Sequence, residues 1–62
     1  MPGEREVRYV LKRLANEGWK KKSVRGSHVK LYKNDKIIVV SVSKREIPLG
    51  TYRTIARQAG WL

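Results

Sequence analysis

Two tight-turn signals constrain the fold of this chain more than any other feature. Glycine at the first position of a two-residue loop is typical of a type II′ hairpin, and Gly26-Ser27 supplies it. Asn34-Asp35 is a second, weaker turn signal. The run that follows, "IIVVSV", is rich in β-branched residues, which are typical of a well-covered strand. Residues 20–43 are therefore predicted to form three antiparallel strands joined by two hairpins.

The two hairpins, read independently, sort the side chains onto the same two faces. Side chains alternate along a strand, and residues opposite one another share a face. The apolar face collects Val24, Val29, Leu31, Ile38, Val40 and Val42. The basic face collects Lys21, Ser23, Arg25, His28, Lys30, Tyr32, Ile37, Val39 and Ser41. In this register His28 lies between Arg25 and Ser41, and Lys21 lies opposite Tyr32.

A short amphipathic helix is predicted on each side of the strands. The first covers residues 4–17, with Glu4 and Glu6 in its first turn and Gly18 as its left-handed end. Its apolar stripe is Val7, Val10, Leu11 and Leu14. The second covers residues 51–59. Its apolar stripe is Tyr52, Ile55, Ala56 and Ala59.

The second helix is expected to be capped by Thr51 and to end at Gly60. Trp19 and Trp61 follow the two helices and are expected to fold back onto them as core residues. Both apolar helix stripes must be buried against another element, and the apolar face of the sheet supplies that surface. The prediction is one α+β domain over residues 1–62, with the order α-β-β-β-α and both helices on one face of the antiparallel sheet.

The charge balance indicates the class of partner. The chain has 15 Lys and Arg residues against 5 Asp and Glu residues, a net charge of +10, which favours nucleic acid, an anionic membrane surface or an acidic protein. The basic residues are spread along the chain, and 40% of residues are hydrophobic, so a folded domain is expected. The lack of cysteine suits a reducing cytoplasm. No membrane span or signal peptide is evident, and the chain is expected to be a complete small gene product.

His28 is the only histidine and the centre of the candidate site. One histidine and five scattered acids do not make a catalytic zinc site, so no metal or cofactor is expected. Histidine exchanges protons near neutral pH, and RNA carries its own nucleophile, the 2′-hydroxyl. One positioned acid or base and nearby cations can therefore cut RNA. Arg25, Lys30 and Lys21 are expected to hold phosphate, and Tyr32 to stack a base or share protons.

Simpler interpretations stay open beside this one. A lone histidine next to a turn is often inert or a plain phosphate contact. Lys22 and Ser27 complete the predicted phosphate-binding set, but the lysine run is as readily a solvated edge, and Ser27 serves the turn itself. Ile37 and Val39 leave an apolar patch on the open face, which indicates a homodimer or a protein contact.

The segments "EGWKKKSVRGSHVKLY" and "LGTYRTIARQAGW" make the chain resemble the HicA (YcfA-like) family of toxins, over about Glu4 to Leu62. The resemblance implies a fold like that of double-stranded-RNA-binding domains. It also implies a cytoplasmic, metal-independent endoribonuclease, or mRNA interferase, of a type II toxin–antitoxin system, active in the stress response. Its essential histidine corresponds to His28, and its partner is a HicB-type antitoxin that covers the active surface.

One departure from the family pattern bears on chemistry. Many members have a Pro-x-His step at the end of the third strand, where this chain has Ser41 and Ser43. A single imidazole cannot be both acid and base, so Lys30, Tyr32 or water would take the second role. A non-catalytic basic RNA-binding module of the same fold is the alternative function. A third interpretation is a toxin-derived part of a protein complex.

Overall fold

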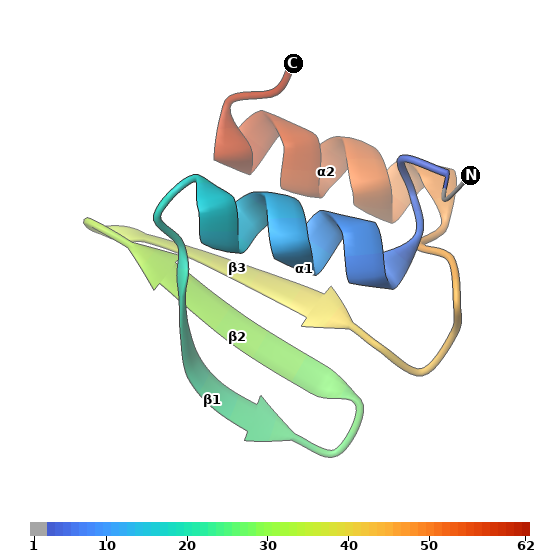
Figure 1. Cartoon of the computed structure of the whole chain (residues 1–62), viewed down its shortest axis with the longest axis horizontal. Coiled ribbons are helices and arrows are strands. Elements are labelled where there is room, and N and C mark those ends of the chain that lie inside the picture. Colours follow the sequence, from blue (N-terminus) through green and yellow to red (C-terminus); the bar gives the residue numbers. More distant parts are fainter. Residues whose placement is uncertain (1–2) are drawn as a thin grey trace.

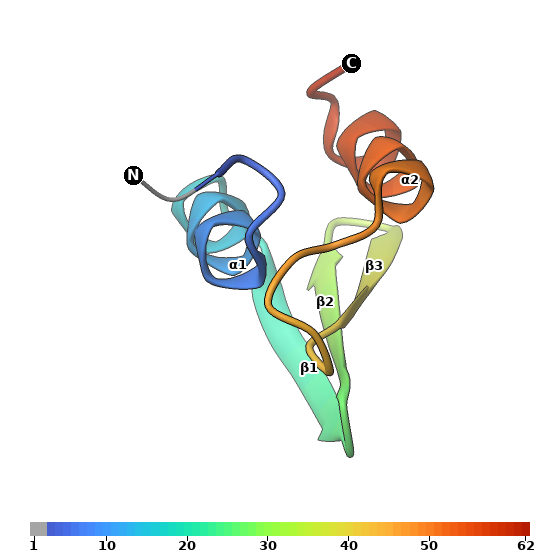
Figure 2. The ribbon, with the colours of Figure 1, turned by 90° about the vertical axis from the view of Figure 1, so that its right-hand side faces the viewer.

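A computed structural model describes residues 3–62 of the chain. It contains helix α1 (Val7–Asn16), strands β1 (Lys20–Arg25), β2 (His28–Lys33) and β3 (Lys36–Ser41), and helix α2 (Leu49–Ala59). The three strands form one antiparallel sheet in the order β1-β2-β3. Both helices lie on the same side of the sheet and run in the same direction (Figure 1 and Figure 2). The predicted α+β class and the element order α-β-β-β-α are confirmed.

One apolar core fills the space between the helices and the sheet. The predicted helix stripes and sheet face supply its buried residues Val7, Val10, Leu14, Val29, Leu31, Ile38, Val40, Tyr52, Ile55 and Ala56. Trp19 also packs into the core, as predicted, and is 4% exposed. Val24 was expected there, but it is 60% exposed. All residues of β1 are exposed, so the helices leave this valine uncovered, although they bury Val29 directly opposite it.

Helix α1 begins at Val7, not at residue 4 as predicted, because the chain before it pairs with the link that follows β3. The Val7 N–H donates to the Arg45 carbonyl at 2.9 Å, and the Ile47 N–H donates to the Arg5 carbonyl at 2.8 Å. This pairing keeps the residues before Val7 out of the helix. It also buries Ile47, which is 2% exposed and was missing from the predicted core.

The predicted placement of Glu4 and Glu6 in the first turn of the helix is therefore wrong. That turn contains no acidic residue. Glu6 is instead the N-cap residue, and its side chain makes no capping hydrogen bond. Its Oε1 lies 3.6 Å from Nε of Arg45. The nearly buried carboxylate of Glu6 is thus balanced by an ion pair with the link.

Helix α2 begins earlier than predicted, and the expected Thr51 cap is wrong. Pro48 occupies the N-cap position with φ −55° and ψ 146°, and no side chain caps the helix. Because this extended proline is followed directly by helical backbone, Thr51 lies inside the first turn. At the other end Gly60 has the predicted left-handed conformation, with φ +82°. The Trp61 N–H then donates to the Ala56 carbonyl at 2.7 Å.

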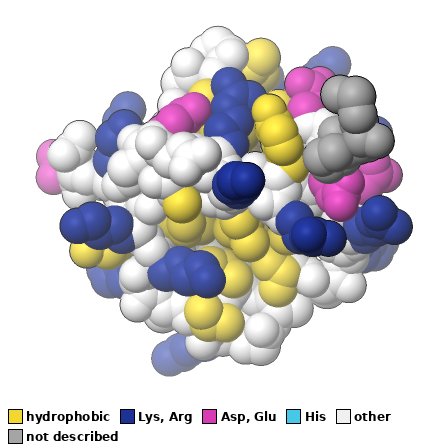
Figure 3. Space-filling model, in the orientation of Figure 1, with side chains coloured by type: hydrophobic (Ala, Val, Ile, Leu, Met, Phe, Trp, Pro, Cys, Tyr) yellow, Lys and Arg dark blue, Asp and Glu magenta, His cyan; other side chains and the backbone are white. Residues whose placement is uncertain are grey.

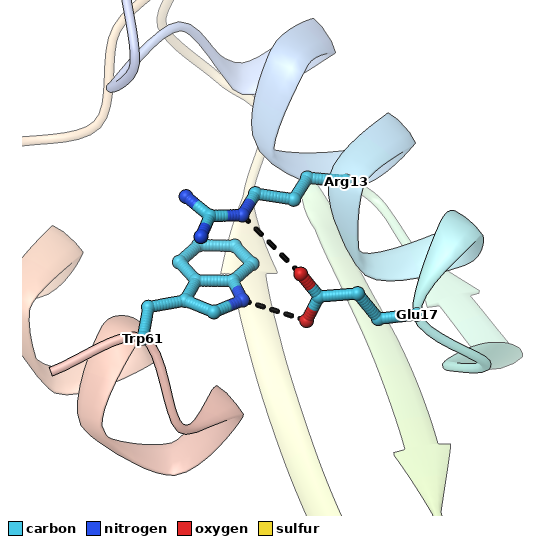
Figure 4. Close-up of polar contacts among 3 residues, drawn as sticks. All are labelled: Arg13, Glu17 and Trp61. Carbon is cyan, nitrogen blue, oxygen red and sulfur yellow. Dashed lines mark hydrogen bonds and ion pairs between the residues drawn. The ribbon is translucent and has the colours of Figure 1, made fainter.

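A polar cluster, the Glu17 clasp of Arg13, Glu17 and Trp61, joins α1 to the segment after α2 (Figure 4). The Glu17 carboxylate accepts the indole N–H of Trp61 at 2.7 Å and the Nε–H of Arg13 at 3.3 Å. The guanidinium carbon of Arg13 lies 4.0 Å from the centre of the Trp61 ring. The return of Trp61 was predicted, whereas its hydrogen bond to Glu17 was not.

The Trp61→Phe substitution is expected to lower the free energy of unfolding by about 1–2 kcal/mol, because the clasp loses the indole N–H and part of the ring. Urea unfolding followed by circular dichroism measures this change. Tyr9→Phe is the control, since Tyr9 is 40% exposed and lies outside the clasp. We expect the control to stay within about 0.5 kcal/mol of the parent. Equal losses in both variants would contradict a stabilising clasp.

Candidate nucleic-acid interface

The side of the sheet that faces away from the helices carries nine side chains in three rows, here called the open face. Each row takes one residue from each strand, and the rows are Arg25–His28–Ser41, Ser23–Lys30–Val39 and Lys20–Tyr32–Ile37. The β2 and β3 residues between them are buried under the helices, so these nine point the other way. Opposite residues lie about 4.5–5.5 Å apart at Cα, and successive rows about 6.6 Å apart. None of the nine is acidic.

His28 is the first residue of β2 and lies directly after the predicted hairpin turn. Gly26 has φ +53° and Ser27 does not have a positive φ, as a type II′ turn requires. The Ser27 carbonyl accepts the N–H of Val42 at 2.6 Å, which fixes the turn to the end of β3. Ser27 is half-buried at the rim of the open face, whereas His28 is exposed. A ligand lying on the open face can therefore reach the imidazole.

Arg25 and Lys30 are the cations of the open face nearest to His28. Arg25 is directly opposite His28 on β1. Lys30 is two residues after His28 in β2 and lies on the same face of the sheet. Both are exposed. Within residues 3–62, neither forms an ion pair with a carboxylate. The sheet thus brings an imidazole together with two cations, a guanidinium and an ammonium, that no described carboxylate neutralises.

Lys21 does not lie on the open face with them, contrary to the predicted register, and Lys22, which is exposed, is the residue at which β1 bulges. The pairs next to the turn are as predicted, but a β-bulge at Lys22 shifts the rest of β1. Lys21 is consequently opposite Leu31, on the side of the sheet that the helices cover. Lys20 takes the place opposite Tyr32. The sequence could not reveal this shift, because three successive lysines show no alternation that marks which of them faces which way.

The end of the open face away from His28 is apolar. Tyr32, Ile37 and Val39 are 39%, 42% and 46% exposed, and Tyr32 is directly opposite Ile37. At the His28 end, the residue on β3 is Ser41, whose Oγ lies 3.2 Å from Oγ of Ser43. The open face therefore pairs His28 with a serine hydroxyl and has no second imidazole.

The side of the molecule that carries the helices differs from the open face in the side chains that it exposes. Figure 3 shows Lys and Arg side chains scattered over it, hydrophobic side chains in its centre, and no histidine on the visible face. A hollow of about 840 Å³ lies along α1 and Arg45. None of its lining residues belongs to the open face. A basic sheet face whose histidine does not line this hollow suits an extended anionic polymer better than a small molecule.

The described residues offer no cluster for a metal ion and no membrane span. Within residues 3–62, no three His, Cys, Asp or Glu side chains lie close enough together to bind a metal. Neither α1 nor α2 has the length and apolar character needed to cross a bilayer.

Comparison with known proteins gives one match. The model of a family described as HicA toxin of bacterial toxin–antitoxin systems matches residues 7–61, which is most of the chain. No curated protein and no solved structure matches significantly.

Proposed function

The chain belongs to the HicA family of bacterial toxin–antitoxin toxins, and we propose that it is an endoribonuclease that cleaves messenger RNA without a metal. The observation that carries this proposal is the row of the open face in which His28 lies between Arg25 and Ser41, with Lys30 in the next row. An exposed imidazole beside two unneutralised cations is suited to proton transfer at a phosphodiester.

The proposed reaction uses the nucleophile that RNA already carries. The 2′-oxygen attacks the adjacent phosphorus, the bond to the 5′-oxygen breaks, and a cyclic phosphate and a 5′-hydroxyl form. His28 either takes the proton of the 2′-hydroxyl or gives a proton to the departing 5′-oxygen. Arg25 and Lys30 hold the phosphate and stabilise the charge that builds on it.

The second proton-transfer group is best sought close to His28. Lys30 and water remain candidates, and the hydroxyl of Ser41 joins them because it is directly opposite His28. Tyr32 is four residues further along β2, about 13 Å from His28 at Cα. That separation argues against both side chains exchanging protons at one phosphate.

The proposed partners are messenger RNA, in the cytoplasm, and a HicB-type antitoxin. The family to which the chain belongs implies an antitoxin. A partner that masks the open face is expected to present acidic side chains to Arg25, Lys30 and Lys20.

The test is to incubate the pure protein with long single-stranded RNA in EDTA, beside the His28→Ala protein. Cleavage by the parent and its loss in the variant support the proposal. If neither protein cuts but both bind RNA with a steep salt dependence, the protein is a basic RNA-binding module. The observation that favours this second function is the lack of a second imidazole, because Ser41 and Ser43 stand where many family members have Pro and His.

The bulge in β1 predicts different roles for two neighbouring lysines. Lys20→Gln is expected to weaken RNA binding by about threefold to tenfold and to reduce the salt slope by roughly one, because Lys20 lies on the open face. Lys21→Gln removes the same charge on the other side of the sheet and should change affinity by less than about twofold. Titration at several salt concentrations measures both. A larger effect at Lys21 would contradict the open face as the RNA surface.

A further inference from the structure

We propose that the apolar end of the open face is a subsite for an unpaired nucleobase, with Tyr32 as its stacking platform, so that the protein acts on single-stranded RNA. This inference rests on the proposed binding of RNA by the open face. It assigns Tyr32 one of the two roles that the sequence left open, namely stacking rather than proton transfer.

Position is the first argument. Tyr32 and His28 lie on the same face of one strand, in the third and first rows of the open face. Lys30 lies in the row between them. A strand of RNA that runs along β2 therefore meets the imidazole, then a cation, then an aromatic ring. The register thus places an aromatic side chain where a base next to the bound phosphates would lie.

The surroundings of the ring are the second argument. Tyr32 is 39% exposed, and its neighbours Ile37 and Val39 are 42% and 46% exposed, so an apolar shelf extends from the ring across β3. Lys20 lies on the other side of Tyr32, and Lys30 borders Val39. A nucleotide has an apolar face and an anionic backbone, and this shelf with cations along it complements both.

Selectivity follows from the same geometry. A base within a duplex is stacked on its neighbours and cannot lie flat on a protein ring, whereas an unpaired base can. The open face therefore requires at least one unpaired nucleotide a short distance from the phosphate at His28. The stacking is sequence-tolerant, because every base has a π-face.

Binding of a short 2′-O-methyl RNA tests the inference without any cleavage. We compare it with the same sugar–phosphate backbone lacking all bases, at fixed salt, for the parent, Tyr32→Leu and Tyr32→Trp. The parent should bind the base-containing strand about tenfold more tightly than the base-free strand. Tyr32→Leu, which keeps an apolar side chain, should shrink that ratio to about twofold, and Tyr32→Trp should keep it.

Tyr9→Leu is the matched control, because Tyr9 is 40% exposed but lies on α1, on the opposite side of the sheet. It should leave the ratio unchanged, and thermal melting verifies that every variant is folded. Binding by the parent with an equal ratio in parent and Tyr32→Leu overturns the subsite and leaves the proposed nuclease untouched; the apolar shelf then belongs to a protein contact. If the parent binds neither strand, RNA recognition itself fails.

Discussion

We expect the His28→Ala substitution to lower the rate of RNA cleavage by a factor of about 10²–10⁴ and to leave RNA affinity within about twofold of the parent. The loss is large because no other imidazole exists in the chain to transfer the proton. The affinity is retained because Arg25, Lys30 and Lys20 stay in place on the open face. Cleavage is measured with excess protein over a labelled single-stranded RNA, in EDTA.

Affinity is best measured with 2′-O-methyl RNA, which has no free 2′-hydroxyl and cannot be cut by the proposed reaction. Lys36→Gln is a suitable control, because it removes an exposed cation at the far end of β3, outside the rows of the open face. Cleavage by this control should stay within about threefold of the parent. Retention of full activity in His28→Ala would contradict the proposed mechanism, since the imidazole is its only assigned proton-transfer group near the phosphate.

The two hairpins of the sheet, and with them the position of His28, could be predicted from the turn residues in the sequence. A glycine at the first turn position and an asparagine that tolerates positive φ, at +55° in Asn34, set both hairpins. The pairs near these turns depend only on turn length, so Arg25, His28 and Ser41 were expected in one row, and the structure confirms it. Alternation then separated the buried residues of β2 and β3 from the exposed ones.

Two features could not be predicted from the sequence, namely the start of α1 and the register of the first half of β1. The first depends on contacts between distant segments, and the second lacks a hydrophobic pattern that would mark it. The start of α1 is set by hydrogen bonds between the chain before it and the link after β3, which involve Arg45 and Ile47. No local sequence pattern predicts hydrogen bonds between these two distant segments. The bulge at Lys22 lies among identical residues on an exposed edge, where no apolar side chain fixes the register. Lys20 therefore replaces Lys21 on the open face.

We expect Leu14→Ala to unfold much of the protein. Leu14 is fully buried in α1, and truncating a buried leucine costs about 2–5 kcal/mol. A chain of 62 residues has a total stability of about 3–9 kcal/mol at the usual value per residue, so one such cavity removes a large part of it. Urea unfolding followed by circular dichroism measures the loss, with Leu14→Met expected to cost less than about 1.5 kcal/mol.

Leu49→Ala makes the same chemical change at a leucine that is 49% exposed in α2, and it should change stability by no more than about 0.5 kcal/mol. Similar stability losses at Leu14 and Leu49 would contradict the core assignment of Leu14.

The Leu14→Ala protein also separates RNA binding from RNA cleavage. An unfolded chain with a net charge of +10 still attracts RNA, because phosphate neutralisation needs no fold. The proposed cleavage needs His28 beside Arg25 and Lys30, an arrangement that only the folded sheet provides. Leu14→Ala should therefore retain salt-sensitive RNA binding while its cleavage falls with the fraction of folded protein.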